Sequence, residues 1–374
     1  MSAVCPPGHP LRFVHGVDPL YLYQGLDSVG SLKKAIVDAQ PDLIVPCDDG
    51  VVWQLHELHA RNPELRSLIE RSLGSPNAFP AIRSRAATLE TAVALGIRVP
   101  ETQTITSDAD LMQWCIDNPG VLKLDGTWGG SGVAIATTQA EAIAAFHKLS
   151  QPMGASVAWK RWLINHDPLA LWSWRRREIP RVTIQEFIPG RPANTMFACW
   201  KGEVLGLVTV EVLTAQGKTG AATVVRLIEN SEIENAARLL ARHFSLSGFH
   251  GLDFILEQST GAAYLIELNP RSTQLGHLRL PIQGDLVGML AAKLKDQPRP
   301  PAEDFIQDET IAFFPQAITW NPKSEFLRQG YHDVPVGEPE LHRELLRKSW
   351  PERQLLSRIY HSFRTVSHQE EVRF

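Results

Sequence analysis

Apolar positions recur along the chain with two different spacings, which predict a mixture of helices and strands. An apolar residue every three or four positions predicts helices at 32–39, 51–61, 63–73, 86–95, 139–149 and 233–244. Short apolar runs rich in β-branched residues predict strands at 2–5, at 43–46, within 121–136, and at 182–188, 203–213 and 222–228. The order strand, helix, strand at the start of the chain predicts a small parallel α/β layer there.

Breaks between these patterns predict three parts of the chain. The stretch 74–84 is predicted to be a linker between domains. The end of the chain is predicted to be an appendage that carries a helix at 339–348. We expect an N-terminal α/β domain at 1–84, a central domain at 85–298 whose glycine-loop lobe spans about 118–188, and a C-terminal extension at 299–374.

Composition and charge exclude some classes of protein. Hydrophobic residues make up 44% of the chain and charged residues 21%, which is typical of globular domains and excludes a mainly disordered chain. Lys and Arg number 37 and Asp and Glu number 41, a formal net charge of -4. The chain therefore lacks the basic excess that favours binding to nucleic acid.

Cysteine usage and hydropathy indicate a cytoplasmic protein. The four cysteines Cys5, Cys47, Cys115 and Cys199 lie far apart and form no CxxC pair, so we interpret them as reduced thiols. No apolar run approaches the roughly 20 residues that cross a bilayer, and the first residues lack the basic start and apolar core of a signal peptide. We expect no membrane partner, and a homodimer, the commonest oligomer, is compatible with the sequence.

The strongest local signal is a predicted β-hairpin that carries acidic residues. Two apolar strands flank the turn at 258–261. If the hairpin is symmetric about Thr260, Asp253 faces Glu267 directly, with Cβ atoms about 5 Å apart. Asn269 shares their face because strand side chains alternate. Opposed carboxylates repel, and a divalent cation between them relieves the repulsion; oxygen ligands of this kind suit Mg²⁺ or Mn²⁺, which also bind nucleotide phosphates.

The alternative for this hairpin is a solvated strand face with incidental acids. Arg271, two residues beyond Asn269, argues for the metal site, because a guanidinium can bind phosphate oxygens in a bidentate way.

A second candidate is the glycine-dense loop at 126–132, where four of seven residues are glycine. Without side chains, backbone N–H groups can approach phosphate oxygens, and Lys123 on the preceding strand supplies a cation. The alternative is a flexible hairpin turn beside an unrelated lysine. The loop lacks GxGxxG spacing, so a Rossmann dinucleotide site is not supported. The tryptophans between 159 and 174 could stack on a ligand, but core packing or a protein contact is the simpler interpretation.

Taken in order, these motifs resemble the ATP-grasp superfamily of carboxylate-amine ligases. The order is Lys123 with the glycine loop, then the motif QEFIPG at 185–190, then Asp253, and then the motif ELNPR at 267–271. The resemblance covers roughly 30–295. It implies an α+β fold in which ATP is clamped between two lobes, preceded by a small α/β parallel-sheet domain.

The resemblance also implies roles for single residues. Lys123 and Arg85, which stands eleven positions before Gly96, would contact ATP. The loop residues Gly129, Gly130, Ser131 and Gly132 would cover its phosphates. Backbone groups at Glu186 and Ile188 would hold the adenine edge, and Gln185 and Phe187 would also bind the cofactor. Asp253, Glu267 and Asn269 match the family's metal ligands, and Arg271 its phosphate-stabilising residue. Arg226 and Lys218 lie where relatives often contact the carboxylate or acceptor substrate.

The chain departs from the family pattern at three points. Arg85 stands where lysine is more usual. Pro192 stands where many members carry a ribose-binding glutamate, with Asn194 as the candidate replacement. The chain begins at what resembles the second strand of the preceding domain, so this domain is either naturally reduced or truncated.

We therefore expect an ATP-dependent ligase that forms amide bonds between small-molecule carboxylates and amines through an acyl phosphate, with ATP and Mg²⁺ or Mn²⁺ as cofactors. A non-catalytic ATP sensor or scaffold with the same fold is the alternative from another class. A carbamoyl-phosphate-like or biotin-carboxylase-like reaction is the alternative among enzymes.

Overall fold

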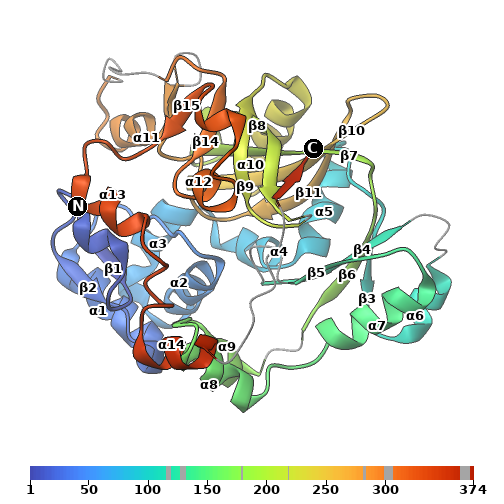
Figure 1. Ribbon diagram of the computed structural model, residues 1–374, viewed down its shortest axis with the longest axis horizontal. Helices are drawn as coiled ribbons and strands as arrows, with labels where there is room; N and C mark the ends of the chain where they lie inside the picture. The colour runs from blue at the N-terminus through green and yellow to red at the C-terminus, as the bar shows by residue number, and fades with distance from the viewer. Residues whose placement is uncertain are drawn as a thin grey trace.

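The structure is a computed structural model that describes residues 1–114, 119–126, 132–177, 180–217, 219–280, 284–298, 306–362 and 371–374. Figure 1 shows an N-terminal unit of short strands and helices in blue, a small four-stranded sheet with its helices, and a large eight-stranded sheet. The described helices include none that is both long and apolar enough to cross a membrane. Cys5, Cys47 and Cys199 are free thiols, as predicted, and Cys115 lies outside the described residues.

The N-terminal unit packs three helices around a small core. Its elements are β1 Ala3–Cys5, η1 Pro10–Phe13, β2 Leu20–Leu22, η2 Gly25–Asp27, α1 Ser28–Ala39, α2 Asp49–Arg61, η3 Pro63–Leu65 and α3 Arg66–Leu73. Helix α1 begins where Asp27 Oδ1 accepts a hydrogen bond from Gly30 N, and α2 begins where Asp48 Oδ1 accepts from Gly50 N. Leu55 of α2 is fully buried in the core of the unit, so the predicted helical faces are confirmed.

The predicted strand at 43–46 is wrong. Parallel pairing does occur in this unit, but between β1 and β2, which both precede α1. Ile44 N donates to Ser72 Oγ at 2.9 Å, and Pro46 O accepts from Ser272 N at 3.0 Å. These backbone groups are satisfied by α3 and by a distant part of the chain, so the segment does not need a neighbouring strand.

The stretch 74–84, predicted to be a linker, is largely helical. It contains η4 Pro76–Ala78 and α4 Phe79–Ile82, and α5 Arg85–Ala94 follows at once. Ala78 and Ile82 are buried in the main core of the molecule. The stretch is therefore part of the packed structure, and the boundary at 84 stays a prediction.

The small sheet has the order β3-β6-β4-β5 and is antiparallel throughout. Its strands and helices are β3 Thr102–Ile105, α6 Asp108–Gln113, β4 Gly120–Leu124, β5 Val133–Ala136, α7 Gln139–Leu149 and β6 Val182–Glu186. Leu122 and Ile184 are fully buried under α6 and α7. Strand β6 ends at Glu186, two residues before the predicted end.

The tryptophan-rich stretch forms α8 Ala155–Leu163 and α9 Ala170–Arg176. Trp172 packs with Tyr23 and Leu169 in a small core between α9 and the N-terminal unit. The core-packing interpretation is thus confirmed for Trp172, whereas Trp159 is 40% exposed.

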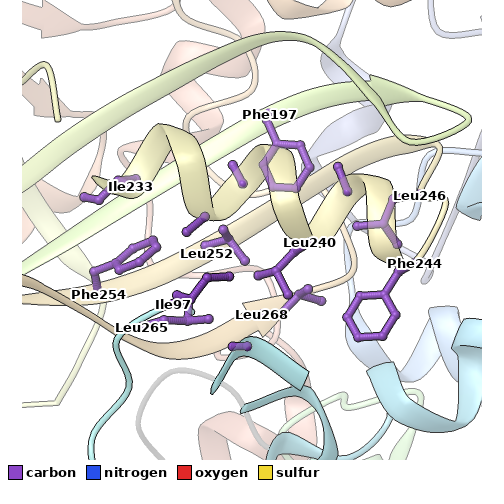
Figure 2. Packing of buried hydrophobic residues seen from close by; sticks show 14 of the residues in the cluster. Ile97, Phe197, Ile233, Leu240, Phe244, Leu246, Leu252, Phe254, Leu265 and Leu268 are labelled. Atoms are coloured by element: carbon purple, nitrogen blue, oxygen red, sulfur yellow. The ribbon is translucent and has the colours of Figure 1, made fainter. Parts of the chain in front are cut away.

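The large sheet has the order β11-β10-β7-β8-β9-β14-β15, and β16 pairs with β8. Its strands from the middle of the chain are β7 Gly190–Trp200, β8 Glu203–Gln216, β9 Ala222–Leu227, β10 Gly248–Glu257 and β11 Ala263–Asn269, with the helices α10 Ser231–His243 and α11 Leu286–Leu294. Strands β12 Arg279–Leu280 and β13 Gly284–Asp285 pair with each other in a separate two-stranded sheet. Figure 2 shows Leu240 of α10 beside Leu252 and Leu268 of the hairpin. Each such side chain contributes roughly 1.5–3 kcal/mol by its burial. Helix α11 packs on β7 and β8.

The C-terminal segment belongs to this sheet and is not an appendage. It supplies β14 Thr310–Phe313, α12 Gln316–Trp320, η5 Glu325–Leu327, β15 Tyr331–Asp333, α13 Pro339–Leu345, α14 Leu355–Ser362 and β16 Glu371–Arg373. Ile311 and Phe313 of β14 are buried, and this apolar strand needs the sheet to cover it. Figure 1 shows α13 beside the N-terminal unit and α14 beside α8.

Candidate functional site

The hairpin of β10 and β11 places the predicted acidic residues opposite each other. Asp253 pairs with Glu267, as predicted, and Gly251 pairs with Asn269. Nearer the turn the pairing is shifted by one residue: Phe254 pairs with Leu265, whereas symmetry about Thr260 would pair it with Ile266. A β-bulge between these pairs absorbs the difference and leaves Ile266 as the extra residue. Without the bulge Glu267 would point to the other face of the sheet.

The carboxylate of Asp253 is held by two amide side chains. Asn194 Nδ2 of β7 donates to its Oδ1 at 2.6 Å, and Asn269 Nδ2 donates to its Oδ2 at 3.0 Å. Burial, together with the negative charge of Glu267, raises the pKa of Asp253 above its usual value. Positive charge brought between the two carboxylates would reverse this effect.

Arg85 links Glu267 to the end of β4. It is the first residue of α5, its side chain is 7% exposed, and it forms ion pairs with Glu267 at 2.6 Å and with Asp125 at 3.1 Å. Burial opposes ionisation of Glu267, but the positive charges of Arg85 and Lys123 outweigh it and hold the pKa of Glu267 below its usual value. The predicted basic residue therefore does lie in the acidic cluster.

Lys123 is a buried cation on β4, opposite Thr183 of β6. Burial and the positive charge of Arg85 lower the pKa of Lys123 to about 8. Among the described residues, none accepts a hydrogen bond from its ammonium group. A buried ammonium without such a partner is a site for an anionic ligand.

Arg271 connects the end of β11 to the N-terminal unit. Its Nε donates to Asp49 Oδ2 at 3.0 Å, and Nη2 donates to Asn269 Oδ1 at 3.4 Å. The neighbouring Ser272 N donates to Pro46 O. Burial raises the pKa of Asp49, although Arg271 opposes the shift. The loop before α2 is thus docked on the same residues that follow the hairpin.

The predicted adenine-binding residues lie at the end of β6. The backbone N–H groups of Glu186 and Phe187 donate to Glu101 O and Pro119 O. Gln185 is 1% exposed, and its side-chain Nε2 has no hydrogen-bond partner among the described residues. A buried carboxamide nitrogen of this kind is a free donor for a ligand. The part of Ile188 in adenine binding stays a prediction.

The remaining predicted residues are the glycine loop, Lys218 and Arg226. Gly129, Gly130, Ser131 and Lys218 lie outside the described residues. Gly132 O accepts a hydrogen bond from Leu124 N at 2.8 Å. Arg226 pairs with Glu211 across the sheet, and Glu211 pairs with Ala193, so the three side chains lie on one face. The side chain of Ala193 belongs to the core under α10. Asp253 pairs with Asn194, the residue after Ala193, whose side chain lies on the opposite face.

This register places Arg226 on the sheet face opposite Asp253. Arg226 and Arg191 both form ion pairs with the buried carboxylate of Glu211. The side chain of Arg226 is therefore paired with Glu211, away from the acidic cluster.

Three residues of the site carry no assigned role in the sequence analysis: Asp49, Asp125 and, as a partner of Asp253, Asn194. Asp125 directly follows the strand of Lys123, which is the signal that could have found it. Asp49 follows the 43–46 segment at the start of a predicted helix, a position where acids are common for capping alone.

Two cavities adjoin the cluster. A cleft of about 3310 Å³ runs between the N-terminal unit, α8, α9 and the loop after β11. A small cavity of about 40 Å³ is lined by Arg85, Asp49, Asp125 and Glu267. The described residues contain no cluster of three or more His, Cys, Asp or Glu side chains that could hold a metal ion.

Comparison with known proteins places this geometry in a fold family. Residues 170–274 match the family model described as an ATP-grasp domain. The chain has the ATP-grasp fold. The resemblance and the α+β fold class predicted from the sequence are thereby confirmed.

Solved structures with this fold cover most of the chain. The carboxyaminoimidazole ribonucleotide synthase of Aspergillus clavatus, complexed with ATP, is 16% identical, covers 82% of this chain and 72% of its own, and has a TM-score of 0.54. The N5-carboxyaminoimidazole synthetase of Staphylococcus aureus, complexed with ADP, is 13% identical over 80% of this chain and 71% of its own, with a TM-score of 0.53.

The phosphoribosylamine–glycine ligase of Thermotoga maritima is 16% identical over 82% of this chain and 78% of its own, with a TM-score of 0.50. No curated protein matches the sequence of this ATP-grasp chain.

Proposed function

We propose that this ATP-grasp protein is an ATP-dependent ligase that joins a small-molecule carboxylate to an amine through an acyl phosphate. The observation that carries the proposal is the meeting of Asp253, Glu267 and Asn269 with three cations, Lys123, Arg85 and Arg271, in one partly buried site. Phosphoryl transfer needs this combination: oxygen ligands for a metal and positioned charge for the phosphate oxygens.

The residues fit ATP. Gln185 Nε2 and Arg85 Nε are buried donors without partners among the described residues. Lys123 is a third, largely buried donor, 6% exposed. A bound nucleotide would give each of the three a hydrogen-bond acceptor. This would remove the free-energy cost of burying the donor without a partner. Gln185 lies at the end of β6, where the base would bind, and the two cations lie toward the hairpin.

The residues also fit Mg²⁺ or Mn²⁺. The oxygens of Asp253, Glu267 and Asn269 are hard ligands, and the bulge at Ile266 keeps the two carboxylates on one face. A divalent cation there would neutralise charge on the transferred phosphoryl group. Arg85 would then share Glu267 with the metal.

The chain's own residues position and stabilise the reacting groups. The substrate carboxylate attacks the γ-phosphorus, the bond to ADP breaks, and an acyl phosphate forms; the amine then attacks the acyl carbon and phosphate leaves. Lys123, Arg85 and Arg271 would stabilise the phosphoryl oxygens by fixed charge. Asp49 would hold Arg271 in position through its hydrogen bond to Nε.

Trapping of the acyl phosphate tests the proposal. Purified protein is incubated with MgATP, hydroxylamine and a pool of amino acids and carboxylic acids, while ADP release is followed. ADP together with a hydroxamate supports the ligase, and division of the pool then identifies the acid. ATP binding without pool-dependent ADP release contradicts it.

A non-catalytic ATP-binding sensor or scaffold is the second candidate. One observation favours it: Arg85, in place of the usual lysine, already engages an oxygen of Glu267 at 2.6 Å. A guanidinium held in this way competes with a metal for the carboxylate. If this competition dominates, ATP binds equally well with and without Mg²⁺, and calorimetric titration in the presence of EDTA distinguishes the two functions.

A further inference from the structure

Arg85 bridges the two sheets at the candidate site. It begins α5, which packs on β11 of the large sheet, as Figure 1 shows. Its Nη2 donates to Oε1 of Glu267 on β11 at 2.6 Å. Its Nη1 donates to Oδ1 of Asp125 at 3.1 Å, and Asp125 directly follows β4 of the small sheet. One guanidinium therefore holds two carboxylates that belong to different sheets.

Asp125 has a fixed place beside this guanidinium. Its side chain is 12% exposed, and its Oδ2 accepts a hydrogen bond from the backbone N–H of Arg85 at 3.4 Å. The N–H of Asp125 itself donates to Arg181 O at 3.0 Å. The next residue, Gly126, has φ +74°, and a Cβ atom there would lie 2.2 Å from Cη2 of Trp53. The surrounding backbone therefore determines where the carboxylate of Asp125 lies.

The guanidinium of Arg85 is divided between its two partners. An arginine can bind a single carboxylate through two parallel hydrogen bonds, one to each oxygen. Arg85 makes only one such bond to Glu267, and within the described part of the chain no donor reaches Oε2 of Glu267. The side chain of Glu267 is 31% exposed, whereas that of Arg85 is 7% exposed. Glu267 thus keeps one oxygen open for a ligand.

The division matters because both groups are needed for other contacts. If Nη1 were not engaged by Asp125, the fork of Arg85 would be able to close on both oxygens of Glu267. A carboxylate held in that way has no oxygen left for a divalent cation, which binds through such oxygens. The charge-assisted hydrogen bond from Nη1 to Asp125 opposes this closure.

We propose that Asp125 is a positioning residue, which holds the fork of Arg85 open so that Glu267 stays available to the metal ion of a bound metal–nucleotide complex. Asp125 acts through Arg85 and needs no contact with the nucleotide. The inference rests on the proposed function for one point, the role of Glu267 as a metal ligand.

Nucleotide binding with and without metal tests the inference independently of turnover. A non-hydrolysable ATP analogue is titrated calorimetrically into the full-length protein in Mg²⁺ and again in EDTA, and the ratio of the two affinities measures what the metal adds. Asp125→Asn should lower this ratio about 10-fold, a coupling typical of residues in contact. In the Arg85→Lys background, where the ammonium has no fork, Asp125→Asn should lower the ratio at most about 3-fold.

The matched control is Asp167→Asn. The side chain of Asp167 is 13% exposed and pairs with an arginine, Arg161, so its burial and its kind of partner resemble those of Asp125. It lines the large cleft but not the small cavity that contains Arg85 and Glu267. This variant should keep the ratio of the wild type. Thermal unfolding shows whether each variant is folded.

Arg85→Lys alone covers the case in which Asp125→Asn does not fold. Because Asp125 already holds the fork open, replacing the fork by an ammonium should not raise the ratio of affinities. A ratio raised 10-fold or more would show that Arg85 competes with the metal in spite of Asp125, and would overturn the inference.

The outcomes separate the inference from the proposed function. The inference is overturned if the wild type gains no affinity from Mg²⁺, if folded Asp125→Asn keeps the wild-type ratio, or if Asp125→Asn lowers the ratio equally in both backgrounds. A fall that needs the arginine supports it. If this fall occurs but no hydroxamate forms in the trapping assay, the role of Asp125 stands and the ligase proposal fails. If hydroxamate forms while the ratio is independent of Asp125, the ligase stands and the inference fails.

Discussion

Asp49 accepts a hydrogen bond from Nε of Arg271 at 3.0 Å, although 222 residues separate them in the sequence. The contact joins the first turn of α2 in the N-terminal unit to the segment that follows the β10–β11 hairpin. Ser272 N donates to Pro46 O beside it, so two hydrogen bonds dock the N-terminal unit on the candidate site. The site is therefore built from both parts of the chain.

This contact gives the first prediction. Asp49→Asn removes the charge that orients Arg271, and carboxylate-dependent ADP release should fall about 10- to 100-fold, because a displaced catalytic group loses most of its effect. Asp27→Asn is the matched control: Asp27 begins the neighbouring helix α1 and an asparagine there still caps it. Equal rates of ADP release in the two variants would show that Asp49 does not position Arg271.

Lys123 gives a prediction on stability against pH. Its pKa is lowered from 10.5 to about 8 in the folded state, mainly by burial. Between these pH values the unfolded chain holds one proton more than the folded chain, so raising the pH favours folding. The free energy of unfolding of the wild type should rise from pH 8 to 10.5 relative to that of Lys123→Met.

Chemical denaturation at several pH values, without nucleotide, measures this difference. The comparison with Lys123→Met cancels the contributions of the other titrating groups. The free energy of unfolding of Lys123→Met is subtracted from that of the wild type. If this difference is constant with pH, or falls as the pH rises, burial does not lower the pKa of Lys123.

The ion pairs of Arg85 give a third prediction. Arg85→Ala leaves Glu267 and Asp125 without their partner, and the free energy of unfolding should fall by about 3 kcal/mol. Arg98→Ala, which breaks an exposed pair with Glu232, should cost less than about 1 kcal/mol. Mg²⁺ should restore more stability to Arg85→Ala than to the wild type, because the metal replaces the missing charge. Denaturation with and without Mg²⁺ measures both effects.

Short-range patterns in the sequence predicted the centre of the site. The pairing of Asp253 with Glu267 follows from a hairpin whose strands are close in sequence, and the alternation of strand side chains places Asn269 beside them. The bulge at Ile266 could not be predicted, since it depends on packing against the rest of the sheet. The bulge shifts the pairing by one residue between the turn and Asp253. The predicted pair of Asp253 and Glu267 was therefore right, although the predicted symmetry about Thr260 was wrong.

Long-range packing explains what the sequence could not predict. Strand β7 was missed because Met196, Phe197, Ala198 and Cys199 are buried on both faces, which removes the alternation that marks a strand. The segment 43–46 has a strand's composition but bonds to Ser72 and Ser272 instead. The contact of Asp49 with Arg271 depends on the docking of two units, and no local pattern reports it.

The central claim is that the paired carboxylates serve phosphoryl transfer, and Glu267→Gln tests it most directly. The variant keeps the size of the side chain, so the fold should persist by thermal unfolding, while the loss of the metal-binding charge should abolish ADP release. ADP release is measured with MgATP and the acid found by hydroxylamine trapping, for the wild type and the variant side by side. Turnover by the wild type alone is the predicted result; equal ADP release by both proteins would contradict the account.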